Sequence, residues 1–471
     1  MKSVALHNLG CKVNSYEIEV MQQMLQEKGY TIVPFDETAD IYIVNTCTVT
    51  NIADRKSRQM LHRAKQKNPA ALVVAVGCYV QTGREDVEQD PCIDLAIGNN
   101  RKKDLASILE EYLQDLEQED AVAENAENAG HGVDKTLHDT TVIDINHTAE
   151  YEEMTLKQTA EHTRAYIKIQ DGCNQFCSYC VIPYARGRVR SRKPEDVEAE
   201  VKGLVARGYR EVVLTGIHLS SYGTEHMEGS PVKGGDWDSG PLWDLIERIH
   251  RVEGLERIRL GSLEPRIITR EFAEKLAGLP EFCPHFHLSL QSGCDATLKR
   301  MNRHYTTEDY LRRCGILREI FDHPAITTDV IAGFPGETEE EFEETRRFLE
   351  TVRFYEMHVF KYSKRQGTRA AVMEDQVSEQ VKARRSDVLL ELEKTMSREY
   401  RERFAGSRVS VLFEEAAEIG GKWYMMGHTP QYVRAALPLE DGMNREEFGG
   451  RIMELFASGL LNDEMLKVEF S

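Results

Sequence analysis

Short apolar runs alternate with amphipathic stretches through about the first hundred residues of the chain. The apolar runs cover residues 4–6, 41–44 and 72–76, and helical patterns cover about 15–28 and 51–67. Strands that alternate with helices in this way predict successive βαβ units around a parallel sheet. We therefore expect a doubly wound α/β domain over residues 1–112.

A second, longer series of alternating segments lies between residues 164 and 400. Strand-like runs that are each followed by a helical pattern are typical of a parallel β/α barrel or partial barrel. These runs cover residues 165–169, 211–215, 257–260, 285–290, 326–331 and 355–360. Ligands should gather at the carboxyl ends of the strands, and the segment 225–240 looks like a surface loop on that rim.

The remaining segments differ from these two domains in composition. Residues 113–163 carry acidic polar runs with few aromatics, which predicts a linker with at most brief ordered pieces. A long charged helix over about 378–404 leads to a final domain at 401–471. The short runs of that domain, 409–413 and 432–436, are broken by Gly and Pro, a pattern that predicts a small β-barrel.

Charge and cysteine content narrow the functional classes. The chain has 471 residues and a net charge of −20, which argues against non-specific nucleic-acid binding, because such binding requires Lys and Arg to neutralise phosphates. No apolar run is long enough to span a membrane, and the first residues build no signal sequence. Ten cysteines without a secretion signal indicate reduced thiols in the cytoplasm.

One local segment is nevertheless strongly basic. Residues 185–193 contain no acid and carry Arg186, Arg188, Arg190, Arg192 and Lys193. A charged run of this kind is usually a solvated surface loop. Because this one directly follows a cysteine cluster, we expect it to contact RNA phosphates.

That cysteine cluster is the most specific chemical motif in the chain. Cys173, Cys177 and Cys180 have the spacing C-x3-C-x2-C directly after the first predicted barrel strand. A structural zinc site normally has four ligands, whereas a four-iron cluster held by three thiolates keeps one iron open for chemistry. The alternative is a zinc knuckle with a remote fourth ligand, although no nearby His or Cys supplies one.

Three further cysteines occupy equivalent positions in the N-terminal domain. Cys11, Cys47 and Cys78 each follow one of the apolar runs within a few residues. They should therefore lie beyond the carboxyl ends of neighbouring parallel strands, where open α/β sheets bind ligands. Any one of them alone would be a core residue more often than a ligand. Three at equivalent positions indicate a second cluster site.

The sequences around both sets of cysteines resemble one enzyme family. DGCNQFCSYC resembles the radical S-adenosylmethionine superfamily, and LGCKVNSYE, NTCTVT and VGCYVQ resemble the N-terminal domain of its methylthiotransferases. The resemblance covers essentially the whole chain, because the tail is similar to the family's OB-like RNA-binding barrel, the TRAM domain. It implies S-adenosylmethionine and two [4Fe-4S] clusters, held by Cys11, Cys47, Cys78, Cys173, Cys177 and Cys180. It leaves four other cysteines as structural residues: Cys92, Cys283, Cys294 and Cys314.

The resemblance also implies a reaction. In that family one S-adenosylmethionine donates a methyl group to a sulfur associated with the N-terminal cluster, and a second is cleaved to a radical that removes hydrogen from the substrate carbon. An electron donor such as flavodoxin or ferredoxin would be a partner. Residues at the strand carboxyl ends should then bind S-adenosylmethionine, and the candidates are Gly216, Glu264, Ser289, Gln291 and Gly333.

The substrate follows from the same resemblance. GCKVNSYE and IQDGCNQFCSYCVIPYARGRVRSR are most similar to the bacterial enzymes that act at C2 of N6-threonylcarbamoyladenosine 37 in the tRNA anticodon loop. N6-isopentenyladenosine in tRNA and a ribosomal-protein aspartate are alternative substrates, and a non-catalytic, metal-containing RNA-binding protein is the alternative class. DNA is not expected as a partner. A threonyl carboxylate would require a cation, for which Arg188, Arg190, Arg259 and Arg266 are candidates, although phosphates would select arginines equally well.

Overall fold

The computed structural model describes residues 2–124, 141–159, 163–226, 235–440 and 445–470. The chain divides into two compact units. The first comprises Met1–Gln158, Asp171–Gln175 and Cys180–Arg190, and the second comprises Thr159–Gln170, Phe176–Tyr179 and Ser191–Ser471. Within the described part of the chain, no helix combines the length and the apolar character that crossing a membrane requires.

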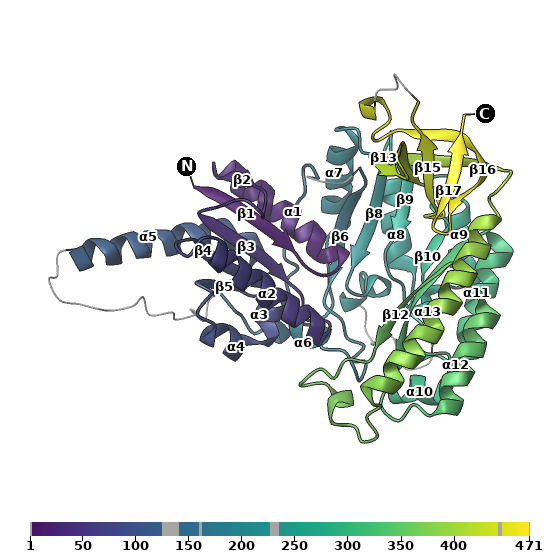
Figure 1. Cartoon of the computed structure of the whole chain (residues 1–471), viewed down its shortest axis with the longest axis horizontal. Helices are drawn as coiled ribbons and strands as arrows, with labels where there is room; N and C mark the ends of the chain where they lie inside the picture. Colours follow the sequence, from purple (N-terminus) through teal and green to yellow (C-terminus); the bar gives the residue numbers. More distant parts are fainter. Residues whose placement is uncertain (1, 125–140, 160–162, 227–234, 441–444, 471) are drawn as a thin grey trace. The chain divides into compact units, whose positions relative to one another are not determined.

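The first unit is built on a five-stranded parallel sheet, as predicted (Figure 1). Its strands are β1 (Ser3–Asn8), β2 (Thr31–Val33), β3 (Ile41–Thr46), β4 (Leu72–Gly77) and β5 (Leu95–Ile97), in the order β2-β1-β3-β4-β5. Every residue of β3 and β4 is buried, as expected for central strands covered on both faces. The chain order reverses between β1 and β3, which places the ligand crevice of a doubly wound sheet at their carboxyl ends.

The helices of this unit in the described part of the chain are α1 (Lys12–Glu27), α2 (Asn51–Lys67), α3 (Cys78–Thr82), α4 (Arg84–Gln89), α5 (Leu105–Glu124) and the short α6 (Ile182–Arg186). Helix α2 packs Leu61 and Ala64 against the sheet. The Thr50 side chain caps its N-terminus by accepting a hydrogen bond from the Ala53 amide, 3.1 Å away. Its amphipathic pattern was therefore a reliable guide to its position.

The predicted linker differs from the structure in two places. Helix α5 continues to Glu124, well beyond the expected boundary at residue 112, because the segment is rich in strong helix formers. Residues 141–158 belong to the first unit and pack against its other parts, since the Tyr16 hydroxyl lies 2.5 Å from the Met154 carbonyl oxygen and the Gly98 amide donates to the Thr141 carbonyl. Residues 125–140 and 160–162 of the predicted linker lie outside the described residues.

The second unit contains the predicted partial barrel, which confirms the expected fold class. Strands β6 (Ala165–Asp171), β8 (Glu211–Gly216) and β9 (Arg257–Leu260) form one parallel set, with β7 (Arg190–Ser191) at its edge. Strands β10 (His285–His287), β11 (Ala325–Ala332) and β12 (Glu356–Lys361) form another. Isolated bridges, among them Leu263 to Leu288, connect the two sets.

The outer face of the partial barrel carries the apolar core, and its inner face is polar. Ile167, Leu214, Phe286 and Val330 pack in the same cluster as residues of the surrounding helices, including Val201. Those helices are α7 (Pro194–Val205), α8 (Gly240–His250), α9 (Arg270–Ala277), α11 (Thr307–Ile320) and α12 (Glu339–Val352) (Figure 1). Because side chains alternate along a strand, the neighbouring positions point inward. Those positions include Lys168, Thr215, Arg259, His287 and Asp329.

A small closed β-barrel ends the chain, as predicted (yellow in Figure 1). It follows helix α13 (Glu379–Glu402) and has the strands β13 (Arg408–Ile419), β14 (Lys422–His428), β15 (Arg434–Pro438), β16 (Ile452–Asn462) and β17 (Met465–Glu469). Two inward-facing arginines of β9 bind the segment between β14 and β15 of this C-terminal barrel. Arg257 donates to the His428 carbonyl at 2.9 Å, and Arg259 donates to the Pro430 carbonyl at 2.8 Å. Arg259 is therefore a structural anchor rather than a free cation for a substrate carboxylate.

Candidate functional site

The structure brings the three N-terminal cysteines to one edge of the parallel sheet. Cys11 precedes α1 directly after β1, Cys47 follows β3, and Cys78 is the first residue of α3 after β4. These strands are neighbours, so their carboxyl ends lie side by side. Gly10 adopts a φ of +113°, and a Cβ atom at this position would come within 3.1 Å of Cys47 Cβ. Glycine therefore allows the loops after β1 and β3 to approach each other.

The surroundings of these thiols suit a metal cluster with sulfur ligands. Desolvation raises the pKa of both Cys11 and Cys47, the latter to about 11, whereas the nearby Arg186 guanidinium favours their thiolates. The Asn99 side-chain amide lies 3.4 Å from Cys78 Sγ and can donate a hydrogen bond to it. Buried positive charge and N–H donors stabilise thiolate ligands and tune the potential of a cluster.

Arg186 belongs to a buried charge network in the first unit. Its guanidinium lies 2.6 Å from Glu17 and 3.2 Å from Asp171, and both carboxylates are buried. Lys102, also buried, lies 2.5 Å from Glu17. Arg190 lies 3.8 Å from Asp171 and donates to the Arg186 carbonyl at 3.0 Å. The two buried carboxylates require these cations, because an unpaired buried charge is costly.

Three of the four arginines that were expected to contact RNA are buried in the structure. Arg186, Arg190 and Arg192 are each only 1% exposed, and Arg192 pairs with Glu200 of α7. Arg188 and Lys193 are exposed. The candidate positive surface of this segment is thus reduced to two side chains, and Arg190 is no longer available for a substrate carboxylate.

The C-x3-C-x2-C loop follows β6, as expected. The Cys173 amide donates to the Gly187 carbonyl at 3.0 Å. Gly172 has a φ of +71°, and a Cβ atom there would lie 1.8 Å from the Arg188 carbonyl oxygen, so this crossing of the backbone requires glycine. All three cysteines lie within one short loop, and three thiolates in such a loop leave the fourth corner of a cluster open.

Arg303 is a functional candidate that the sequence analysis missed. It follows α10 (Asp295–Arg300), and its Nη1 atom lies 3.3 Å from Cys177 Sγ. Its Nη2 atom donates to the Ser289 carbonyl at 3.1 Å, and its Nε atom donates to the Tyr305 hydroxyl at 2.9 Å. The guanidinium can therefore stabilise a thiolate or cluster sulfur at Cys177. No local motif marks this residue, because the contact joins positions 126 residues apart.

The residues expected to bind S-adenosylmethionine occupy varied environments. The Glu264 carboxylate forms an ion pair with Arg266, whose Nε atom lies 2.8 Å away. Arg266 is therefore not available for a substrate carboxylate either. Ser289 offers its carbonyl to Arg303 and Tyr305. A Cβ atom at Gly216 would lie 2.9 Å from Gln170 Oε1, and Gln291 has a φ of +75°. The Gly333 amide donates to Glu337, 2.8 Å away.

A polar group on the inner face of the second unit was also missed. His287 of β10 lies 3.3 Å from Asp329 of β11 and 3.0 Å from the Thr327 hydroxyl. His358 of β12 pairs in register with Asp329, and its ring centre lies 5.9 Å from that of His287. Desolvation acts to raise the pKa of Asp329, but the hydrogen bond from His287 and the charges of His358 and Arg303 outweigh it and lower the pKa. Asp329 therefore stays ionised as a hydrogen-bond acceptor.

Comparisons with known proteins bear on both units. Residues 167–349 match the Radical SAM superfamily, and residues 3–98 match Uncharacterized protein family UPF0004. The Threonylcarbamoyladenosine tRNA methylthiotransferase MtaB of Bacillus subtilis (strain 168) is 40% identical over 435 residues, which are 92% of this chain and 90% of that protein. The tRNA-2-methylthio-N(6)-dimethylallyladenosine synthase of Carboxydothermus hydrogenoformans is 35% identical over 419 residues, 88% of each protein.

A solved structure shows a related fold. The radical S-adenosylmethionine methyltransferase TsrM from Kitasatospora setae, bound to tryptophan and a cofactor analog, aligns with a TM-score of 0.53 at 16% identity. The alignment covers 76% of this chain and 73% of that one. At this identity the likeness concerns the fold alone.

Proposed function

We propose that this chain, which belongs to the radical S-adenosylmethionine methylthiotransferase family, attaches a methylthio group to C2 of N6-threonylcarbamoyladenosine at position 37 of tRNA. The observation that carries the choice of substrate is the 40% identity, over 92% of the chain, to a relative named for threonylcarbamoyladenosine tRNA. A relative named for dimethylallyladenosine is 35% identical over 88%. The enzyme uses two [4Fe-4S] clusters and S-adenosylmethionine.

The two sets of cysteines divide this chemistry between them. Cys173, Cys177 and Cys180 hold one cluster, and Cys11, Cys47 and Cys78 hold the other. When bound, these groups and S-adenosylmethionine supply the radical that activates the substrate C–H bond and the methylthio group that replaces hydrogen. The chain's own polar residues support the ligands: Arg303 donates toward Cys177, and Asn99 donates toward Cys78.

The S-adenosylmethionine contacts come from the strand carboxyl ends of the second unit. Gly216 and Gly333 supply backbone close to the cofactor, and Glu264, Ser289 and Gln291 supply polar groups. Arg303 supports this assignment for Ser289, because it links the Ser289 carbonyl to the Cys177 thiol. The cofactor and the cluster would then share one set of hydrogen bonds.

The inner face of the second unit contacts the N6 substituent. A threonylcarbamoyl group offers N–H and hydroxyl donors together with a carboxylate. Asp329, which stays ionised, accepts from the donors, and His358, the most exposed of the three inner-face residues, faces the carboxylate. An isopentenyl group offers none of these polar partners, so a polar inner face favours the threonylcarbamoyl substrate.

Transfer RNA is the macromolecular partner, and the anticodon loop presents the base. A loop nucleotide is already unpaired and can be turned out at modest cost. Arg188 and Lys193 supply exposed positive charge. On the C-terminal barrel, Trp423 is 39% exposed and Arg445 lies 3.6 Å from its ring centre, a combination suited to a stacked base. A flavodoxin or ferredoxin supplies electrons, and the reaction takes place in the cytoplasm.

Mass spectrometry of tRNA nucleosides tests this function. A strain lacking the protein should lose 2-methylthio-N6-threonylcarbamoyladenosine and accumulate the unmethylthiolated nucleoside, and the wild-type gene should restore it. An intact signal in the deletion strain would contradict the proposed substrate. Loss of the isopentenyl counterpart instead would assign the chain to the alternative tRNA substrate.

A further inference from the structure

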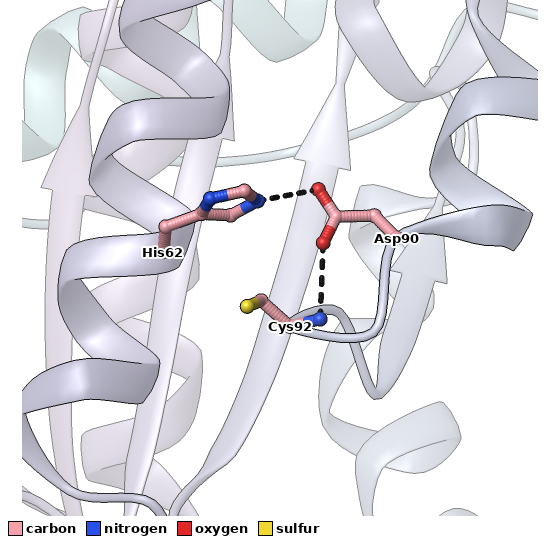
Figure 2. A group of neighbouring side chains, drawn as sticks. All are labelled: His62, Asp90 and Cys92. Atoms are coloured by element: carbon pink, nitrogen blue, oxygen red, sulfur yellow. Dashed lines mark hydrogen bonds and ion pairs between the residues drawn. The ribbon is translucent and has the colours of Figure 1, made fainter.

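We propose that His62, Asp90 and Cys92 form a binding site for a transition-metal dication, Zn²⁺ in the first instance, separate from both cluster sites. Figure 2 shows the three side chains converging from α2 and from the loop that follows α4. The imidazole, carboxylate and thiol donor atoms all lie within 4.8 Å of one another. All three residues belong to the first unit.

The loop after α4 holds two of the donors in place. The Cys92 amide donates to Asp90 Oδ1 at 3.0 Å, which fixes the carboxylate over the following turn. Pro91 between them restricts the backbone. The other carboxylate oxygen, Oδ2, lies 2.7 Å from His62 Nε2 (Figure 2). Little conformational freedom is left to lose when an ion binds.

The charge balance of the group favours a cation. The Asp90 side chain is only 8% exposed, and its ion-pair partner among the described residues is His62. A buried carboxylate is stabilised by a compensating positive charge. A dication placed between the three groups would compensate it fully. The His62 side chain is 45% exposed, which gives an ion and its water ligand a route from solvent.

The donor set selects the class of metal. Imidazole with thiolate suits zinc and related transition metals, whereas magnesium and calcium prefer oxygen ligands alone. Tetrahedral zinc would hold these donors about 3.3 to 3.5 Å apart, given ligand distances of about 2.0 to 2.3 Å. His62 Nε2 and Asp90 Oδ2 are 2.7 Å apart, and all donor atoms of the group lie within 4.8 Å of one another. Small side-chain rotations would therefore suffice.

Binding moves protons in a defined way. The Cys92 thiol releases its proton to solvent as its sulfur bonds the ion. The Nε2 proton that His62 donates to Asp90 passes to solvent and the ring carries its remaining proton on Nδ1, so that the Nε2 lone pair can bond the ion. Water completes the fourth position.

Cys92 differs from the other cysteines that were expected to be structural. Cys283, Cys294 and Cys314 are buried, whereas Cys92 is partly exposed beside two further donors.

The test uses holoprotein that carries both clusters, incubated anaerobically with ZnCl₂ and freed of excess metal by gel filtration. Elemental analysis should find about one zinc per chain. Zinc K-edge absorption should show one sulfur at about 2.3 Å and nitrogen or oxygen ligands at about 2.0 Å. Both Cys92→Ala and His62→Ala should lose this zinc.

A matched control comes from another His–Asp pair in the same unit. His147 lies 2.8 Å from Asp144, and within the described part of the chain this pair belongs to no group of three closely spaced metal-binding side chains, so His147→Ala should retain the zinc. Unchanged melting temperature and cluster absorbance will show that the variants are folded. Wild-type protein that retains no zinc, variants that retain as much as wild type, or a zinc shell with three sulfurs would each overturn the proposal. The last result would place zinc on the cluster cysteines instead.

Discussion

Replacing Arg186 by methionine removes a guanidinium but keeps most of the length and apolar bulk of the side chain. In the structure this guanidinium pairs with Glu17 and Asp171, both buried, and hydrogen-bonds Asn14 at 2.5 Å. The basic sequence around it instead suggests contact with RNA. The two interpretations predict opposite results, so this one variant discriminates between them.

The magnitude follows from the buried partners. Removing one member of a buried ion pair costs about 3–5 kcal/mol, because the other charge is left uncompensated. Lys102 remains 2.5 Å from Glu17, and Arg190 remains 3.8 Å from Asp171. We therefore expect the lower end, about 3 kcal/mol. At about 2–4 °C per kcal/mol for a unit of this size, the first unit should melt about 6–12 °C earlier.

Calorimetry of the anaerobic holoprotein measures this shift, and Arg188→Met serves as the control. Arg188 is exposed, so its replacement should change stability by less than about 0.5 kcal/mol. Its effect should appear in tRNA binding, where losing one phosphate contact reduces the slope of log affinity against log salt by about 0.7–0.9. Arg186→Lys keeps a positive charge without the bidentate geometry, so its melting temperature should lie between those of Arg186→Met and the wild type.

An Arg186→Met protein that melts with the wild type, and that loses tRNA affinity with a shallower salt slope, would refute the buried network. The guanidinium would then face RNA, and its burial against Glu17 would be incorrect. A lower melting temperature with an unchanged salt slope would support the network.

Three further predictions concern the reaction, each checked in anaerobic assays of folded protein. Cys177→Ala should abolish cleavage of S-adenosylmethionine, whereas Cys47→Ala should spare some cleavage and abolish methylthiolation; identical behaviour would contradict two separate clusters. Arg303→Met should lower the midpoint potential of the radical cluster in an EPR-monitored titration, because it removes a hydrogen bond to sulfur, and an unchanged potential would exclude that role. His358→Ala should raise KM for threonylcarbamoyl tRNA by about 10-fold, the effect of about 1.4 kcal/mol, while tRNA-independent cleavage stays at the wild-type rate; an unchanged KM would remove His358 from substrate binding.

The strands and the cysteines were predictable because their signals are local. Apolar runs located β1, β3 and β4, and the cysteines follow each run in sequence, so parallel pairing alone placed them at one edge. Strand β10 is shorter than its apolar run predicted. Beyond His287 the backbone pairing continues only as isolated bridges, Leu263 to Leu288 and Gln291 to Val330, and the Ser289 and Leu290 carbonyls also accept from the Tyr305 hydroxyl.

Which of the arginines are buried was not predictable in the same way. Arg186 and Arg188 are two residues apart in one basic run, yet one is buried and the other exposed. The difference depends on Glu17, which lies 169 positions away in sequence and approaches Arg186 only after the first unit has folded. Composition reports the number of charges in a segment but not their partners. A basic run therefore gives an upper limit on the charge available to RNA.

The polar inner face of the second unit was predictable only in part. The apolar positions Phe286, Val330 and Met357 face the core, so alternation alone implied that residues beside them point the other way. His287, Asp329 and His358 are those neighbours. Their meeting depends on register, since Asp329 pairs with His358 and His287 pairs with Thr327. A shift of one residue would turn one of these side chains to the core. The sequence thus implied a polar inner face, and only the strand pairing determined which residues form a group there.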